Sequence, residues 1–198
     1  MPRPVKYDES VILRAAASIV ADRGPAAATI GAIGGAIGAP SGSIYHRFRT
    51  RDELLGRLWL AKAAFFQGRF AEGLAHPDPY QAGLNGALSL PRAVRQDFEG
   101  ARIMLLHRRE DFLSDSWPPE MAKEARRLGE QVRELLSEIT RRLMDKENEA
   151  NRQLVVFAVL DIPFAAVRRN VAMGKLPPKG AEGLITRAYE AIMADRKR

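Results

Sequence analysis

Residues 29–48 read TIGAIGGAIGAPSGSIYHRF and contain the pattern that decides the fold. Thr29 is a good helix N-cap because its hydroxyl can accept a hydrogen bond from a backbone N–H group that has no partner within the helix. A short apolar helix is expected over 30–37, residues 38–40 break it, and a second short helix is expected over 41–48. Two short helices joined by a tight turn that contains glycine are typical of a helix-turn-helix.

The flanking sequence supplies the rest of such a domain. A helix over 8–23 has Asp8 as its expected N-cap and presents one apolar face, and Gly24-Pro25 ends it. A long helix over 51–74, capped by Thr50, follows the second short helix. The small core is expected to contain the apolar residues of the motif, which are Ile30, Ile33, Ile37, Ile44 and Phe48.

The second short helix has the chemistry of a helix that enters a DNA groove. Small residues at its start let the backbone approach a duplex, and a helix N-terminus favours phosphate. Tyr45 and His46 can donate to phosphate oxygens or contact thymine methyl groups, and the nearby arginines can neutralise phosphates. The alternative is that these are ordinary side chains on a solvated surface.

The remainder of the chain also has helical spacing, with sparse β-branched residues and almost no strand-like alternation. We expect an all-α fold of about nine helices, with later helices over 80–95, 98–109, 118–145, 148–172 and 181–195. Pro91 should kink or shorten the first of these, and Pro163 should interrupt the fourth. Both kinks are candidates for shaping a pocket.

Composition sets broad limits on function. The 198 residues are 46% hydrophobic, which suffices for a core, and the net charge of +7 favours a polyanionic partner. The absence of cysteine excludes disulfides and fits a reducing cytoplasm. The start of the chain lacks the apolar region of a secretory signal, and the longest apolar run, 154–160, is too short to span a bilayer. We therefore expect a cytoplasmic protein with no membrane partner.

Taken together, residues 29–48, the following 50–55 and the Ala-Asp-Arg-Gly sequence at 21–24 resemble the signature of the TetR family of bacterial transcriptional regulators. The resemblance implies a DNA-binding domain over 1–55 and a C-terminal helical domain over 56–198 that dimerises and senses a ligand. It also implies a repressor that binds a near-palindromic operator as a dimer and is released by a small-molecule effector of unknown identity. Two departures stand out: Pro40 replaces the usual serine cap, and Ser41 replaces a basic residue.

The resemblance and the pattern assign candidate site residues. Those expected at the double-stranded DNA are Thr29, Ser41, Gly42, Ser43, Tyr45, His46, Arg47, Arg49 and Arg51, with Arg51 at the position of the family's phosphate-binding residue. Aromatic and other residues that could line a ligand pocket, or simply form core, are Trp59, Phe66, Met104, His107, Trp117 and Phe157. The faces expected to form a four-helix bundle with a second copy carry Leu154, Val155, Ala158, Val159, Ile162, Ala166, Val167, Leu184, Ala188, Ala191 and Ile192.

Other classes of function have less support. A helical enzyme would need a cluster of acid, base or metal-binding residues, and the three histidines are far apart in sequence. Glu72 and His76 form a lone pair and not a metal site, so no metal, cofactor or catalytic residue is expected. The charged segment 107–111 fits an ionic network or a solvated helix end better than a sensing site. A ligand-independent DNA-binding regulator and an activator both remain open.

Overall fold

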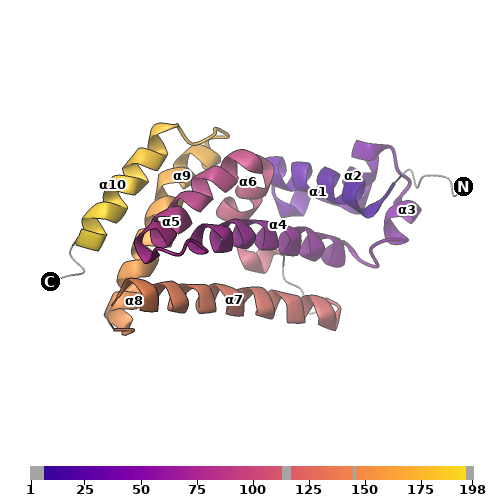
Figure 1. Ribbon diagram of the computed structural model, residues 1–198. Coiled ribbons are helices and arrows are strands. Elements are labelled where there is room, and N and C mark those ends of the chain that lie inside the picture. Colours follow the sequence, from indigo (N-terminus) through magenta and orange to yellow (C-terminus); the bar gives the residue numbers. More distant parts are fainter. Residues whose placement is uncertain (1–6, 113–116, 145, 195–198) are drawn as a thin grey trace, which may run out of the picture.

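The computed structural model describes residues 7–112, 117–144 and 146–194, and every regular element in these ranges is helical (Figure 1). This confirms the all-α expectation. The α-helices are α1 (Glu9–Arg23), α2 (Ile30–Ile37), α3 (Ser41–Tyr45), α4 (Arg51–Leu74), α5 (Pro79–Gln96), α6 (Phe98–Leu106), α7 (Pro119–Leu143), α8 (Glu149–Val156), α9 (Ile162–Ala172) and α10 (Gly180–Ala194). A π-helical segment, Phe157–Asp161, joins α8 to α9 without a break. Counted as one helix, this pair brings the described part of the chain to the nine helices expected.

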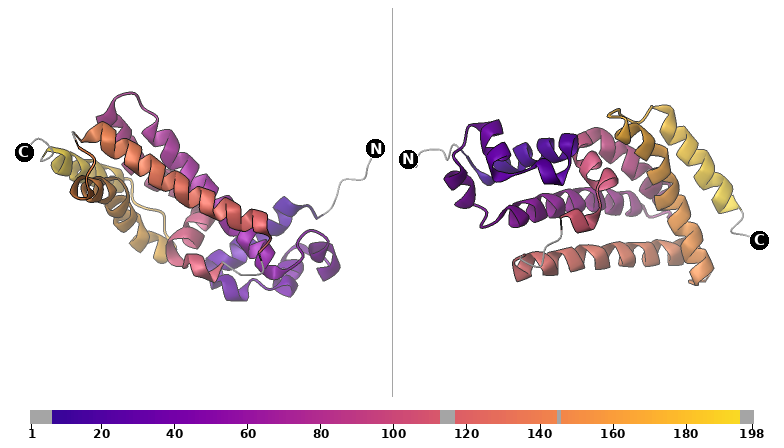
Figure 2. Two further views of the ribbon diagram at one scale, coloured as in Figure 1. Left: turned by 90° about the horizontal axis from the view of Figure 1, so that it is seen from below. Right: turned by 180° about the vertical axis from the view of Figure 1, so that it is seen from behind.

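The helices are arranged along α4, which is shared by both halves of the molecule. Helices α1, α2 and α3 gather at the start of α4, and α5 and α7 pack along it (Figure 1). Helix α8 and its continuation α9 cross the far end, where α10 packs on α5 and α9 (Figure 2). The helix-turn-helix therefore lies at one end of the molecule and the C-terminal helices at the other.

The predicted helix starts are confirmed by their caps. Asp8, Thr29 and Thr50 each accept a hydrogen bond from the backbone N–H three residues later. Two hydrogen bonds lower the pKa of the Asp8 carboxyl. The larger effect comes from the bond that the Val11 N–H donates, and the smaller from the bond that the Ser10 hydroxyl donates. Two predicted ends were too late, because α3 stops at Tyr45 and α6 stops at Leu106.

The two internal prolines have different effects. Pro91 lies inside α5, which continues to Gln96, so the expectation that it ends this helix early was wrong. Pro163 lacks the N–H that would pair with the Val159 carbonyl, and the wider π-helical turn lies immediately before it. Both prolines are buried, and neither lies in a surface turn.

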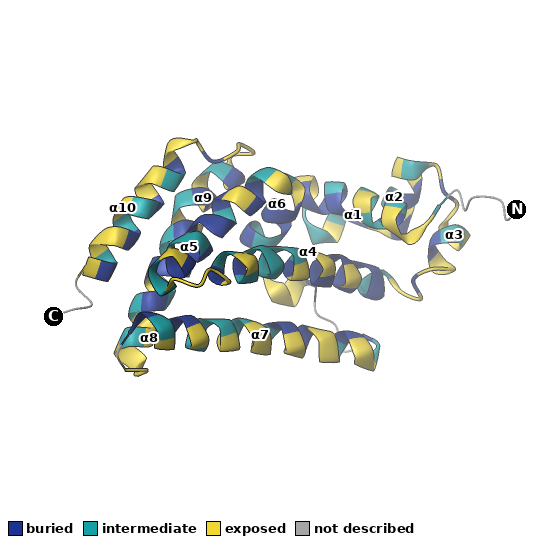
Figure 3. Ribbon diagram, in the orientation of Figure 1, coloured by how far each residue is buried: buried dark blue, intermediate teal, exposed yellow. Residues whose placement is uncertain are grey.

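The hydrophobic core continues across the expected domain boundary (Figure 3). One cluster joins α1–α4 to Ile103, Trp117 and Met121 of the C-terminal half. At Gly56 a Cβ atom would lie 2.4 Å from Cε2 of Trp117, so the absence of a side chain lets this indole rest directly on α4. The division at residue 55 therefore falls within a shared helix and not at a linker, and it stays a prediction.

No helix in the described ranges is both long enough and apolar enough to cross a membrane.

Candidate nucleic-acid interface and ligand cavity

The turn between α2 and α3 is fixed by two glycines. Gly38 has a φ of +66°, and its N–H donates to the Gly34 carbonyl. The Ala39 N–H donates to the same carbonyl at 2.9 Å. A Cβ atom at Gly34 would lie 2.7 Å from the Ala39 oxygen, closer than real Cβ contacts. The sequence thus needs glycine at position 38 for its backbone conformation and at position 34 for the close approach of the turn.

Helix α3 is anchored on one side and exposed on the other. Ile44 and the following Phe48 are completely buried in the core of the domain. Tyr45 is 54% exposed, and Ser41 and Gly42 on the same helix and His46 and Arg47 in the turn after it are exposed as well. The helix and the turn after it therefore present small, aromatic and basic side chains on a backbone that the core holds in place.

The segments around α3 are tied down by long-range and local bonds. The Tyr7 hydroxyl donates to the Gly38 carbonyl at 2.7 Å, which connects the segment before α1 to the turn. After α3, the buried carboxylate of Glu53 accepts from the Arg49 N–H at 2.9 Å and pairs with Arg57 at 2.9 Å. These bonds fix where α3 ends and α4 begins.

The structure gives two of the predicted DNA-contacting residues an additional or different role. The Thr29 hydroxyl accepts from the Ala32 N–H at 3.1 Å, so this exposed side chain already serves as a cap. The Arg51 guanidinium donates to the Ala28 carbonyl at 3.0 Å and to the Pro25 carbonyl. Arg51 therefore ties α4 to the turn before α2, whereas Arg47 and Arg49 are exposed.

The six residues named for a ligand pocket do not come together. Trp59 and Trp117 are buried in the core that supports the helix-turn-helix, and Met104 packs against that core. His107 makes an edge-on contact with Phe112, with ring centroids 6.4 Å apart, and Phe157 is exposed. The alternative interpretation, that large apolar residues at helical spacing form core, is the one that fits the two tryptophans.

The remaining member of that set, Phe66, lines an apolar cavity of about 340 Å³ that is open to solvent and is bordered by α4–α7 and the joined α8–α9 helix. The cavity contains few polar groups. The Oε1 atom of Gln67 is buried and has no hydrogen-bond partner among the described residues. The Ser89 hydroxyl donates to the Gly86 carbonyl at 2.7 Å, and Asp161 is exposed where it lines the cavity. The other lining residues are Phe70, Leu90, Leu105, Val132, Val159, Leu160 and Phe164.

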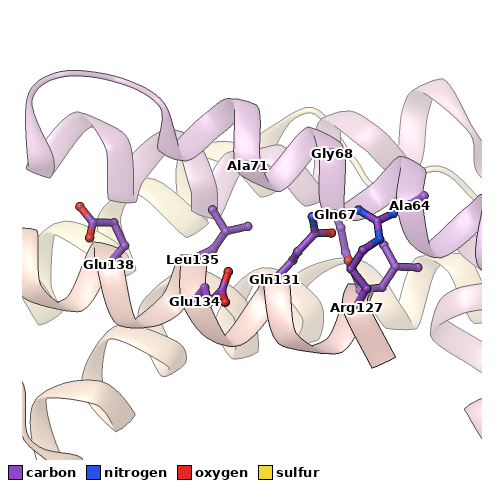
Figure 4. A pocket seen from close by; sticks show the side chains of 10 residues that line it. Ala64, Gln67, Gly68, Ala71, Arg127, Gln131, Glu134, Leu135 and Glu138 are labelled. Atoms are coloured by element: carbon purple, nitrogen blue, oxygen red, sulfur yellow. The ribbon is translucent and has the colours of Figure 1, made fainter. Parts of the chain in front are cut away.

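A second, more polar groove of about 570 Å³ runs between α4 and α7 (Figure 4). Gln67 lines this groove as well as the apolar cavity, so its side chain stands between the two spaces. Apart from Gln67, the charged and amide groups of the groove come from α7 and are Arg127, Gln131, Glu134 and Glu138.

Several residues predicted to lie in a dimer interface are not on the surface of the subunit. Val155, Ala158 and Val159 are buried inside the subunit's own core, as is Val167, so they offer no surface to a second copy. The large apolar side chains that are exposed on these helices are Phe157 (51%), Phe164 (39%) and Leu184 (58%). Of the other residues named for this surface, Ala191 is exposed, and those half-buried are Leu154, Ile162, Ala166, Ala188 and Ile192.

The other candidate clusters are structural. Within the described residues, no group of three or more His, Asp or Glu side chains is placed to hold a metal ion. Glu72 pairs with Arg69, and the charged segment contains the short 3₁₀ turn Arg109–Asp111, where the Asp111 carboxylate accepts from the Arg108 N–H at 2.9 Å.

The two short helices α2 and α3, joined by a turn that requires glycine, form a helix-turn-helix that packs on the larger helical part of the chain. This arrangement places the chain in the class of helix-turn-helix DNA-binding proteins. Residues 12–58 match the family described as "Bacterial regulatory proteins, tetR family". The N-terminal part of the chain is therefore similar to the TetR family, and the resemblance inferred from the sequence is confirmed. No curated protein shows significant similarity to the chain.

Solved structures share the fold of the whole chain. A TetR-like transcriptional regulator from Rhodococcus sp. RHA1 superimposes with a TM-score of 0.72 at 16% identity, covering 98% of both chains. The ketosteroid transcriptional regulator KstR2 of Mycobacterium tuberculosis gives 0.71 at 16% identity, covering 96% of this chain and 95% of the other. The regulator FadR from Bacillus subtilis, solved in complex with stearoyl-CoA, gives 0.70 at 16% identity, covering 94% and 98%. At these identities the similarity establishes the fold.

Proposed function

We propose that this transcriptional regulator is a cytoplasmic repressor that binds a near-palindromic operator as a homodimer and that a small apolar molecule releases from DNA. The observation that carries the proposal is the outer side of α3. Tyr45 on α3 and His46 and Arg47 in the turn that follows it are exposed, while Ile44 and Phe48 anchor the same segment in the core. A recognition helix needs this combination, because base contacts depend on a fixed backbone and phosphate contacts supply most of the affinity.

The exposed apolar residues of the C-terminal helices support a dimer with two-fold symmetry. Phe157 and Phe164 are seven residues apart on one continuous helix, and Leu184 is exposed on the helix packed beside it. Large exposed apolar residues that gather on one face mark interaction surfaces. A two-fold axis would place two copies of α3 in successive major grooves, which requires an operator with matching symmetry.

The apolar cavity supports an effector that is itself largely apolar. Ligand sites are mostly apolar, with a few polar groups that set orientation. Gln67 Oε1 offers such a group, because a hydrogen-bond donor on the ligand would satisfy it. The B. subtilis FadR structure, which shares the fold, was solved with stearoyl-CoA, a molecule with a long apolar chain. A ligand weakens DNA binding only as far as it prefers the conformation that cannot bind DNA.

The test is a DNA titration with matched arginine variants. We expect tight binding to one near-palindromic fragment from the protein's own upstream region, surviving random competitor DNA and weakening with salt. Arg47→Ala should lower the slope of affinity against salt by about one, since it removes one phosphate contact. Arg51→Ala should instead lower the thermal stability of the helix-turn-helix, because its guanidinium bonds two backbone carbonyls.

The outcomes separate the parts of the proposal. If random competitor DNA abolished binding to the upstream fragment and also to fragments selected from random DNA, that result would contradict sequence-specific regulation. Tight binding that no apolar molecule weakens would favour a ligand-independent regulator. Stimulated transcription from the bound promoter would identify an activator in place of a repressor.

A further inference from the structure

The few polar side chains that line the apolar cavity mainly offer hydrogen-bond acceptors. The Ser89 hydroxyl uses its proton in the bond to the Gly86 carbonyl, so it can only accept a bond from a ligand. The buried Oε1 atom of Gln67 has no partner among the described residues, and Asp161 adds a carboxylate. Against these acceptors stands one neutral donor group, the N–H₂ of the same Gln67 amide. The lining therefore suits a ligand that donates hydrogen bonds.

The charge at the cavity is negative. Within the described ranges no lysine, arginine or histidine lines it, and Asp161 is its charged residue. Asp161 and Phe164 are exposed, so the carboxylate lies where the cavity opens to solvent. Arg168 donates to the carbonyl of the lining residue Leu105 at 3.4 Å, but its side chain is not part of the lining. A cation at the open end would face an opposite charge and keep part of its hydration, whereas an anion would face a like charge.

The aromatic part of the lining also favours a cation. Phe66, Phe70 and Phe164 line the cavity, and Phe164 is exposed at the same open end as Asp161. An aromatic ring attracts a cation to its face, and the attraction is larger where water is removed. Most of the remaining lining is aliphatic and would cover an apolar group. With about 340 Å³, the cavity is at the small end of the range for ligand sites, which is roughly 300–1,000 Å³.

We propose that the effector of this cavity is a small lipophilic amine, an apolar molecule that carries a protonated amino group. Its apolar part lies among the phenylalanine and aliphatic side chains, and its ammonium group lies at the open end beside Asp161. A further hydrogen-bond donor on the molecule would satisfy Gln67 Oε1. The inference rests on the proposed function, since it names the class of effector for the same cavity. The preference opposes the chain's net charge of +7, which by itself attracts anions.

The experiment titrates the full-length protein with probes that share one apolar chain and differ in charge. At neutral pH decylamine is a cation, decanol is neutral and decanoate is an anion. Isothermal titration calorimetry gives each affinity, at concentrations below those at which the probes aggregate, and circular dichroism verifies folding. Asp161→Asn removes the charge with little change of shape. Glu190→Gln is the matched control, because Glu190 is an exposed carboxylate on α10 that does not line the cavity, and Val132→Phe fills the cavity.

We expect the wild type to bind decylamine about tenfold more tightly than decanol, and decanoate most weakly. Asp161→Asn should weaken decylamine binding about fivefold and leave decanol binding unchanged, and Glu190→Gln should match the wild type. Decanoate binding as tight as that of decylamine would overturn the inference and leave the effector site standing. A preference for decylamine that persists unchanged in Asp161→Asn would do the same. If no probe bound, or if Val132→Phe did not reduce binding, the effector site of the proposed function would itself be overturned.

Discussion

The two halves of this molecule are specified in different ways. In the helix-turn-helix, single residues meet backbone requirements: Thr29 caps α2, Gly38 adopts a positive φ, and Gly34 lets the turn approach. In the C-terminal half, long helices pack through apolar side chains from distant parts of the sequence and leave a cavity between them. We therefore expect the first half to tolerate little change at these positions, and the second to keep its fold when its cavity changes.

Helix length explains the difference. Helices α2 and α3 have 8 and 5 residues, and isolated helices this short are not stable in water. They need caps, a defined turn and the buried anchors Ile44 and Phe48. Helices α4 and α7 have 24 and 25 residues. Their long apolar faces hold them in place, so they depend less on a particular cap or turn residue.

The sharpest test of this comparison is Gly34→Val. The new side chain would collide with the Ala39 carbonyl, so we expect a loss of stability of about 1–3 kcal/mol or more in the helix-turn-helix and loss of operator binding. Gly35→Ala is the control, since a Cβ atom there meets nothing within 4 Å. It should stabilise α2 by roughly 0.5–1 kcal/mol. Thermal unfolding measures the stability of each variant, and DNA titration measures its operator affinity. A Gly34→Val protein with wild-type stability and operator affinity would show that the turn is not constrained as described.

Loss of a cap should have a smaller effect. Thr29→Ala removes the bond to the Ala32 N–H, and we expect a loss of about 1 kcal/mol in unfolding free energy. Thr29→Ser keeps the hydroxyl and should retain most of the stability. If the serine variant loses as much operator affinity as the alanine variant, Thr29 contributes through its methyl group and not through the cap.

In the C-terminal half, a comparable insertion should cost little. Val132→Phe adds volume where the side chain borders the cavity, so we expect the unfolding free energy to change by less than about 1 kcal/mol. Operator binding should persist while response to an apolar effector is lost. A destabilisation as large as that of Gly34→Val would remove the contrast between the two halves.

The smallest effect concerns pH. The helix bonds that lower the pKa of Asp8 below its ordinary value of 3.8 stabilise the folded protein above that value. This contribution is lost as the pH falls through the lowered pKa, because protonation is easier in the unfolded chain. The difference in melting temperature between wild type and Asp8→Asn should thus shrink between about pH 6 and about pH 3. A difference that grows toward acid would contradict the described cap.

The helix-turn-helix was predictable because its determinants are local. Thr29, Gly38 and the apolar spacing of Ile30, Ile33 and Ile44 each leave a mark in the sequence, and the structure has the helix starts where these residues put them. The role of Arg51 was not predictable in the same way. Its carbonyl partners, Ala28 and Pro25, lie more than twenty residues earlier in the sequence, and only the fold brings them together.

The C-terminal sites depended on burial, which periodicity alone does not reveal. The α8–α9 helix is apolar on more than one face, so its sequence does not distinguish the buried Val155 and Val159 from the exposed Phe157 and Phe164. The sequence by itself determined the helical class, the caps and the DNA-binding motif, because these depend on residues within a few positions of each other. Only the tertiary structure decided which apolar residues form core, line the cavity or stay exposed, because that depends on the helices packed against them.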